Sequence, residues 1–157
     1  MDGQDKQQVY DETIERIEAL IAGETDAIAV MATVVCELHH SLDTFDWTGF
    51  YRVVGPELLK VGPYQGGHGC LAIPFERGVC GAAARSRQTQ VVPDVRDFAG
   101  HIACSATTRA EIVVPVLDPA GELVAVLDID SNQPGAFDEI DRVNLEAICA
   151  LVGNDAS

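Results

Sequence analysis

The chain has 157 residues, of which 47% are apolar and 22% charged, so it can form the core of one globular domain and is too short for two large ones. Ten Lys and Arg against 25 Asp and Glu give a formal net charge of −15, which would repel phosphate backbones and anionic lipid headgroups. No apolar run approaches the roughly 18 to 20 residues of a membrane-spanning helix, and the acidic start MDGQDKQQVYDE is unlike a secretion signal. We therefore expect a cytoplasmic protein that binds neither nucleic acid nor membranes.

Two helices are predicted near the amino terminus. Apolar residues from Tyr10 to Ile21 recur at steps of three and four, which places them on one helix face. Thr25 or Asp26 can cap a second helix that ends near Ser41. Its apolar stripe consists of Ile28, Met31, Val35, Leu38 and Leu42. This stripe suits either the core or the interface of a homodimer.

A third helix is predicted at the carboxyl end, from a cap at Asp138 to a stop at Gly153. The residues expected to face inward are Ile140, Val143, Ala147 and Leu151. Predicted helices therefore lie on both sides of the middle segment of the chain.

The middle of the chain reads as a sheet, because short runs of β-branched and aromatic residues alternate with Gly, Pro and Asp. The predicted strands are Trp47–Val54, Leu58–Tyr64, Thr89–Val92, Glu111–Leu117 and Leu123–Asp130. Hairpin-length turns at Gly55-Pro56 and 118–121 make neighbouring strands antiparallel, and the Ala-rich segment 78–87 suits a short helix. We expect one α+β domain over 1–157: helical at 6–42, sheet and loops at 45–131, and a final helix at 138–152, with the terminal helices on one sheet face.

Carboxylates interrupt the predicted strand Leu123–Asp130, which is otherwise apolar on both faces. Asp128 and Asp130 share one face, and Glu111 begins the neighbouring strand of the hairpin. Clustered acids persist where a cation binds or where one acid stays protonated for catalysis. The alternative is that the strand ends there and both Asp side chains are solvated. Asp94 is a further candidate, although its position also suits a helix cap.

Trp47 and Tyr51 fall on the same face of their strand, where two rings can form the wall of a small pocket. Packing in the core explains the two rings equally well.

Five cysteines in a reducing compartment argue against a static disulfide framework. Cys36 and Cys149 lie in predicted helices and are expected to be buried core residues. Cys70, Cys80 and Cys104 lie in glycine-bounded loops, which suits thiol redox catalysis with one attacking and one resolving sulfur. The competing interpretation is a zinc site, although the spacing matches no familiar closed site. Its ligands would be His68, Cys70, His101 and Cys104.

Several motifs together resemble those of the free methionine-(R)-sulfoxide reductases, a family built on a GAF domain. The motifs are WTGFY at 47–51, PYQG at 63–66, IPFERGVCG at 73–81, GHIAC at 100–104, EIVVPV at 111–116 and GELVAVLDIDS at 121–131. The resemblance extends from Phe45 to the last helix. The one visible departure is GGHGC, where His68 and Gly69 are unusual.

The resemblance implies a role for each matched residue. Cys104 matches the nucleophile, while Cys80 and Cys70 match the cysteines that resolve and relay the disulfide. In this interpretation Cys80 condenses with the sulfenic acid of Cys104, and the bond then exchanges with Cys70. The substrate pocket would be formed by Glu111, Asp128, Asp130, Asp94, Trp47 and Tyr51.

The implied activity is reduction of free methionine-(R)-sulfoxide, an oxidoreductase reaction of oxidative stress, with thioredoxin as the reductant and with no metal or other cofactor. Glu111 or Asp130 would hand a proton to the departing oxygen. Carboxylates in the pocket would select the free amino acid, because a methionine within a polypeptide lacks the α-ammonium group. The alternative is a GAF module that binds a small ligand as a sensor and catalyses nothing.

Overall fold

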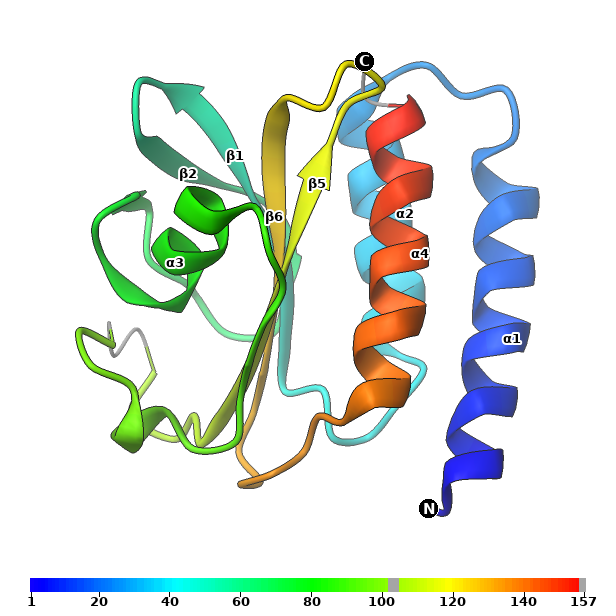
Figure 1. The fold of residues 1–157 in the computed structure, drawn as a ribbon. Coiled ribbons are helices and arrows are strands. Elements are labelled where there is room, and N and C mark those ends of the chain that lie inside the picture. Colours follow the sequence, from blue (N-terminus) through cyan, green and yellow to red (C-terminus); the bar gives the residue numbers. More distant parts are fainter. Residues whose placement is uncertain (102–104, 156–157) are drawn as a thin grey trace.

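The computed structural model describes residues 1–101 and 105–155 (Figure 1). Its helices are α1 (Gly3–Ile21), α2 (Ala27–His39), α3 (Gly78–Ser86) and α4 (Glu139–Asp155), with a short 3-10 helix at Val95–Asp97. Within these ranges, no helix has the length and apolar character needed to cross a membrane.

The strands form one antiparallel sheet in the order β3-β2-β1-β6-β5-β4. Their bounds are β1 (Trp47–Gly55), β2 (Leu58–Gln65), β3 (Ala72–Pro74), β4 (Gln90–Val92), β5 (Ala110–Leu117) and β6 (Leu123–Ser131). The α+β class, the antiparallel sheet and both hairpins are confirmed. Strand β3 was not predicted, because three residues carry no readable period and become a strand only by pairing with β2.

The terminal helices α1, α2 and α4 cover one face of the sheet, as predicted, and α3 lies on the other face (Figure 1). Alternation along the strands supplies a separate cluster of buried residues to each face. Phe50 and Leu127 pack with the terminal helices, whereas Tyr51 and Val126 pack with Ala83 of α3. The central strands β1 and β6 are therefore covered on both sides and held rigidly.

A buried polar network joins α1 to α4. The Tyr10 hydroxyl donates a hydrogen bond to Asp141 Oδ1 at 2.6 Å, and Lys6 Nζ donates to Asp141 Oδ2 at 2.8 Å. Tyr10 and Asp141 are both fully buried, and burial together with the Asp141 charge raises the pKa of Tyr10. Both carboxylate oxygens of Asp141 are thus satisfied, as a buried charge requires.

The inward faces of two helices differ from the prediction. In α2, which begins after Asp26 as expected, Ile28 is 52% exposed, and the helix ends at His39 rather than near Ser41. In α4, Val143 and Ala147 are exposed, and the buried residues include Asp141 and Asn144. These two polar residues bond side chains of α1, so the true interface of α4 is partly polar and an apolar stripe could not reveal it.

Gly153 lies inside α4 and does not end it, contrary to the prediction. A Cβ atom at this position would lie 2.0 Å from the carbonyl oxygen of Leu117 at the end of β5. The glycine is therefore a point of close contact between the last helix and the sheet.

We expect Gly153→Ala to lower the free energy of unfolding by about 1 to 3 kcal/mol or more, because the added methyl group must push α4 off the backbone of β5. Helix propensity alone predicts the opposite sign, a gain of up to about 1 kcal/mol. Urea denaturation measures the difference. Gly55→Ala, where a Cβ meets open space, is the control, and a Gly153→Ala variant as stable as wild type would contradict this account of the contact.

Candidate active site

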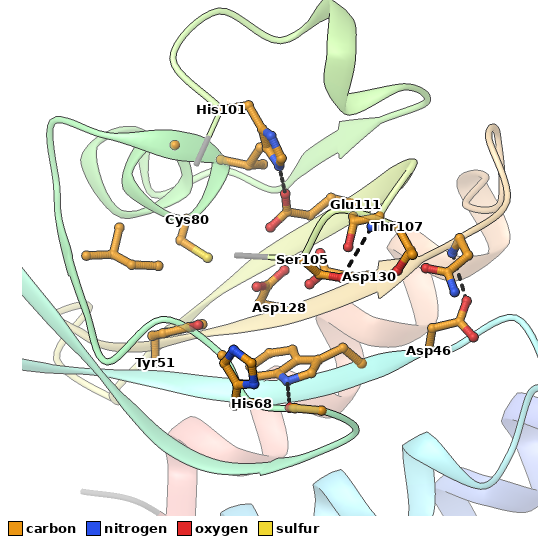
Figure 2. Close-up of a pocket in the computed structure, with 18 residues that line it drawn as sticks. Asp46, Tyr51, His68, Cys80, His101, Ser105, Thr107, Glu111, Asp128 and Asp130 are labelled. Carbon is orange, nitrogen blue, oxygen red and sulfur yellow. Dashed lines mark hydrogen bonds and ion pairs between the residues drawn. The ribbon is translucent and has the colours of Figure 1, made fainter. Parts of the chain in front are cut away.

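A cavity of about 320 Å³ opens on the sheet face that carries α3 (Figure 2). Acidic side chains of β5 and β6 and the aromatic side chains of β1 form two of its walls, and the start of α3 and the segments 67–69 and 105–108 complete it.

Strand register brings the predicted carboxylates together. Asp130 of β6 pairs with Glu111 of β5 on one side and with Trp47 of β1 on the other. Directly paired residues present their side chains on the same face, and Asp128 follows two residues along that face. The three acids therefore meet in the cavity, next to the aromatic wall, as Figure 2 shows.

These acids are largely removed from water, with Glu111 6% and Asp128 5% exposed. Burial and the charge of Asp130 raise the pKa of Glu111 to about 8. Burial and the neighbouring acids likewise hold the pKa values of Asp128 and Asp130 well above the usual range. Because the charged forms are disfavoured, the cluster holds protons at neutral pH, and it also attracts cations.

One oxygen of the cluster is unsatisfied. Oδ1 of Asp128 is buried and has no hydrogen-bond partner among the described residues. Such an atom is costly unless a ligand or water reaches it. The alternative of a solvated strand end does not hold for Asp128.

The aromatic wall is a stack. The rings of Trp47 and Tyr51 lie 5.8 Å apart between centroids at an angle of 27°, and Tyr64 stacks on Trp47 at 5.3 Å. The indole N–H of Trp47 donates to the carbonyl of Gly67 at 2.8 Å. Trp47 and Tyr51 are buried and also line the cavity, so they serve both as core and as wall.

The unusual segment GGHGC lies against this wall. A Cβ atom on Gly69 would come within 2.8 Å of Trp47 Cζ2 and 3.0 Å of the Tyr51 hydroxyl. His68 lines the cavity beside it. Only a residue without a side chain lets the backbone approach the rings this closely.

The cysteines divide by environment. Cys80, near the start of α3, lines the cavity as a buried free thiol, and burial together with the charges of Asp128 and Glu111 raises its pKa. Cys70 is half-buried and disulfide-bonded. The predicted nucleophile Cys104 lies outside the described residues. Cys149 is buried as predicted, whereas Cys36 is exposed because it falls on the solvent side of α2.

The predicted zinc ligands are only partly brought together. His68 and His101 both line the cavity. Cys70 is engaged in a disulfide and offers no thiolate in this state. Cys104, the remaining member of the set, is outside the described ranges.

Asp94 is held away from the other predicted residues. It caps the 3-10 helix by accepting from the backbone N–H of Arg96, and it pairs with the side chains of Arg96 at 2.8 Å and Arg109 at 3.1 Å. The hydrogen bonds from these arginines hold its pKa well below the usual range. Asp94 is not among the described residues that line the cavity, and the helix-cap alternative accounts for it.

His101 and Asp46 are among the cavity residues to which sequence reasoning assigned no pocket role. His101 Nε2 lies 3.6 Å from Glu111 Oε1, and burial lowers the pKa of His101, which favours a neutral imidazole. Asp46 accepts a hydrogen bond from the backbone N–H of Asn132 at 2.7 Å, at the rim. His101 belongs to the GHIAC motif and Asp46 directly precedes the WTGFY motif. This proximity to the motifs was the signal that could have indicated their place in the cavity.

The family model for the GAF domain matches residues 4–154. The chain belongs to the GAF domain family. Free methionine-R-sulfoxide reductase of Escherichia coli is 39% identical over 145 residues, covering 92% of this chain and 87% of that protein. Protein YtsP of Bacillus subtilis is 44% identical over 139 residues, covering 88% and 85%.

Among solved structures, free methionine-R-sulfoxide reductase of Neisseria meningitidis in complex with its substrate matches this GAF domain with a TM-score of 0.92 and 38% identity, covering 99% of this chain and 92% of that one. The resemblance to free methionine-(R)-sulfoxide reductases that the motifs indicate is confirmed by these relatives.

The cavity wall can be tested through Trp47, the single tryptophan of the chain. We expect Gly69→Ala to shift its fluorescence emission maximum, because the new methyl group displaces the Trp47 and Tyr51 rings. Gly67→Ala, where a Cβ has open space, should leave the emission unchanged. Identical spectra for wild type and Gly69→Ala would show that the segment does not press on the wall.

Proposed function

We propose that this protein reduces free methionine-(R)-sulfoxide to methionine, using a thiol nucleophile and a dithiol protein such as thioredoxin as the reductant. The observation that carries the proposal is the cluster of three acids, two of them buried, which faces two stacked aromatic rings across one cavity. That combination suits a small ligand with a cationic end and an apolar, polarisable end. The relatives named as reductases of this substrate support the same assignment.

Each end of the substrate has a matching wall. The Trp47 and Tyr51 rings would pack against the methylene and S-methyl groups, where sulfur and aromatic rings interact favourably. An acid of the cluster would pair with the α-ammonium group and lose its proton in doing so. A methionine inside a polypeptide has no ammonium group, so the same contact would select the free amino acid. The preference for the R epimer rests on the relatives alone.

The chemistry requires one acid to keep its proton. Glu111 or Asp130 would donate a proton to the sulfoxide oxygen, which makes the sulfur more electrophilic. The Cys104 thiolate would attack that sulfur, the S–O bond of the substrate would break, and the oxygen would end on Cys104 as a sulfenic acid while methionine leaves. The substrate sulfur is reduced by two electrons and Cys104 is oxidised by two.

We assign Cys70 as the first resolving cysteine, in preference to the order in which Cys80 condenses first. Cys70 is already disulfide-bonded, whereas Cys80 is a free thiol whose buried, acidic surroundings oppose a thiolate. Attack of the Cys70 thiol on the sulfenic acid of Cys104 would form the disulfide and release water. A dithiol protein would then reduce that disulfide.

The alternative is a GAF module that binds a ligand without chemistry. A cyclic nucleotide is anionic and fits an acid-lined cavity poorly. The deciding experiment follows consumption of reduced thioredoxin with each sulfoxide epimer, free and N-acetylated. We expect turnover of the free R epimer, much weaker turnover of its N-acetyl derivative and none of the S epimer. A protein that binds this epimer and consumes no reductant would be a binding module.

For the cysteines we expect Cys104→Ser to abolish methionine release, because a hydroxyl is a far weaker nucleophile than a thiolate. Cys70→Ser should release about one methionine per chain in a burst and then stall, because the sulfenic acid lacks its resolving partner. Rapid-quench assays of methionine measure the burst.

Cys36→Ser changes an exposed thiol and is the matched control, with wild-type turnover expected. Cys80→Ser distinguishes the two resolving orders. A stall in Cys80→Ser with full turnover in Cys70→Ser would restore Cys80 as the resolving cysteine.

For the carboxylates we expect Asp128→Asn, Asp130→Asn and Glu111→Gln to separate into two classes. The residue that binds the ammonium loses a charge-assisted contact of about 1.5 to 3 kcal/mol, so KM rises roughly ten- to a hundredfold. The proton donor loses its acid, so kcat falls by roughly 10² to 10⁴.

Measurement of kcat and KM with free and N-acetylated substrate assigns the roles. Acetylation of the substrate should raise KM strongly in wild type and only slightly in the variant that has already lost the ammonium contact. Glu122→Gln, an exposed carboxylate just before β6, is the control. If all three cavity variants stay within about twofold of wild type, the range of ordinary surface changes, the acids do not serve the reaction.

A further inference from the structure

Cys80 has no step in the proposed reaction, yet it faces the same acids. The Cys80 sulfur and one oxygen each from Glu111 and Asp128 lie within 4.8 Å of one another, and all three residues are buried. They come from three elements, since α3 carries the thiol and β5 and β6 carry the acids. Figure 2 shows the three side chains converging on the cavity.

The unsatisfied oxygen of Asp128 points to a missing ligand in this cluster. Asp128 is 95% buried, since it is 5% exposed, and its Oδ1 has no hydrogen-bond partner among the described residues. Asp128 lines the cavity, so this oxygen belongs to a side chain that a ligand in the cavity can reach. A cation would satisfy that oxygen.

The sulfur ligand determines which cation fits the cluster. An ammonium group gains from carboxylates and nothing from a thiol, and Mg²⁺ and Ca²⁺ prefer oxygen ligands alone. Zn²⁺ accepts sulfur at about 2.3 Å together with carboxylate oxygen at about 2.0 to 2.2 Å. Ligand atoms already within 4.8 Å of one another need only small side-chain rotations to reach one such ion.

We propose that the cavity binds a divalent cation of the zinc class through Cys80 Sγ and carboxylate oxygens of Glu111 and Asp128. These ligands differ from the four that spacing in the sequence suggests, because Cys80 replaces the loop cysteines and the sheet supplies the acids. His101 Nε2, 3.6 Å from Glu111 Oε1, offers an imidazole for a fourth position. The cation takes no part in the reduction.

The site implies a form of regulation. Glu111 and Asp128 cannot hold a metal ion and a substrate ammonium at once, so the cation and the substrate would exclude each other. This consequence rests on the proposed function, whereas the binding of the cation does not. The protein would then lose reductase activity when free zinc rises.

Co²⁺ is the probe, because a thiolate bound to Co²⁺ produces a sulfur-to-metal charge-transfer band in the near ultraviolet. The protein is used in its oxidised form, in which the Cys70 sulfur is engaged, after removal of metals with a chelator. We expect wild type to develop the band on titration with Co²⁺ and to lose it when Zn²⁺ is added.

Single variants identify the ligands. The band should vanish in Cys80→Ser and persist in Cys36→Ser, which keeps the Cys70 disulfide and changes an exposed thiol. Asp128→Asn and Glu111→Gln keep the thiol and the side-chain volume, and we expect each to weaken Co²⁺ binding at least tenfold. These two variants test the site even if Cys80→Ser does not fold, which circular dichroism checks.

A wild-type protein without the band at saturating Co²⁺, or a folded Cys80→Ser variant that retains it, would overturn the proposal. Equal Co²⁺ affinity in wild type and both carboxylate variants would overturn it as well. Displacement of Co²⁺ by free methionine sulfoxide tests the exclusion separately. A protein inactive as a reductase that still shows the Cys80-dependent band would refute the proposed function and leave the metal site intact.

Discussion

The gathering of three carboxyl groups on one face of β5 and β6, with Glu111 and Asp128 buried, is the constraint on which the cavity depends. Pairing of Glu111 with Asp130 leaves the acids no room to separate. His101 Nε2 lies 3.6 Å from Glu111 Oε1, but burial lowers the pKa of His101, and Arg109 is engaged with Asp94. Without a counter-charge the acids hold protons, and this state persists only until a cation arrives.

The opposite face of the same strands makes this arrangement possible. Leu127 and Ile129 of β6 alternate with Asp128 and Asp130, and they are fully buried against the terminal helices. A central strand fixed on one face cannot shift its register to relieve repulsion on the other, because a slip of one residue would expose every apolar side chain. The free energy gained by burying the apolar side chains thus offsets the electrostatic cost of holding the acids together.

Most of the sheet and the acidic cluster could be predicted, because the apolar, β-branched run of β6 is a strong local signal, its two acids fall on one face, and the hairpin turn fixes its partner β5. Prediction failed where tertiary contacts, and not the local sequence, determine the secondary structure or the buried face of an element. Strand β3 has no period of its own, and α4 turns Asp141 and Asn144 inward to bond α1. The cysteines are a similar case: sequence placed Cys70 and Cys80 in comparable glycine-bounded segments and could not tell that the acids would surround only one of them.

That difference in surroundings separates the chemistry of the two sulfurs. The acids around Cys80 raise the pKa of its thiol, which makes it a slow nucleophile, since the thiolate is the reactive form. The same acids lower the cost of bringing a divalent cation to that sulfur, because a bound metal ion deprotonates the thiol and is neutralised by the carboxylates. Cys70 is half-buried and precedes Leu71, which is 77% exposed, so the proposed reaction has a sulfur that a second protein could reach. Exchange with an external dithiol needs that access, and a thiol enclosed with three acids lacks it.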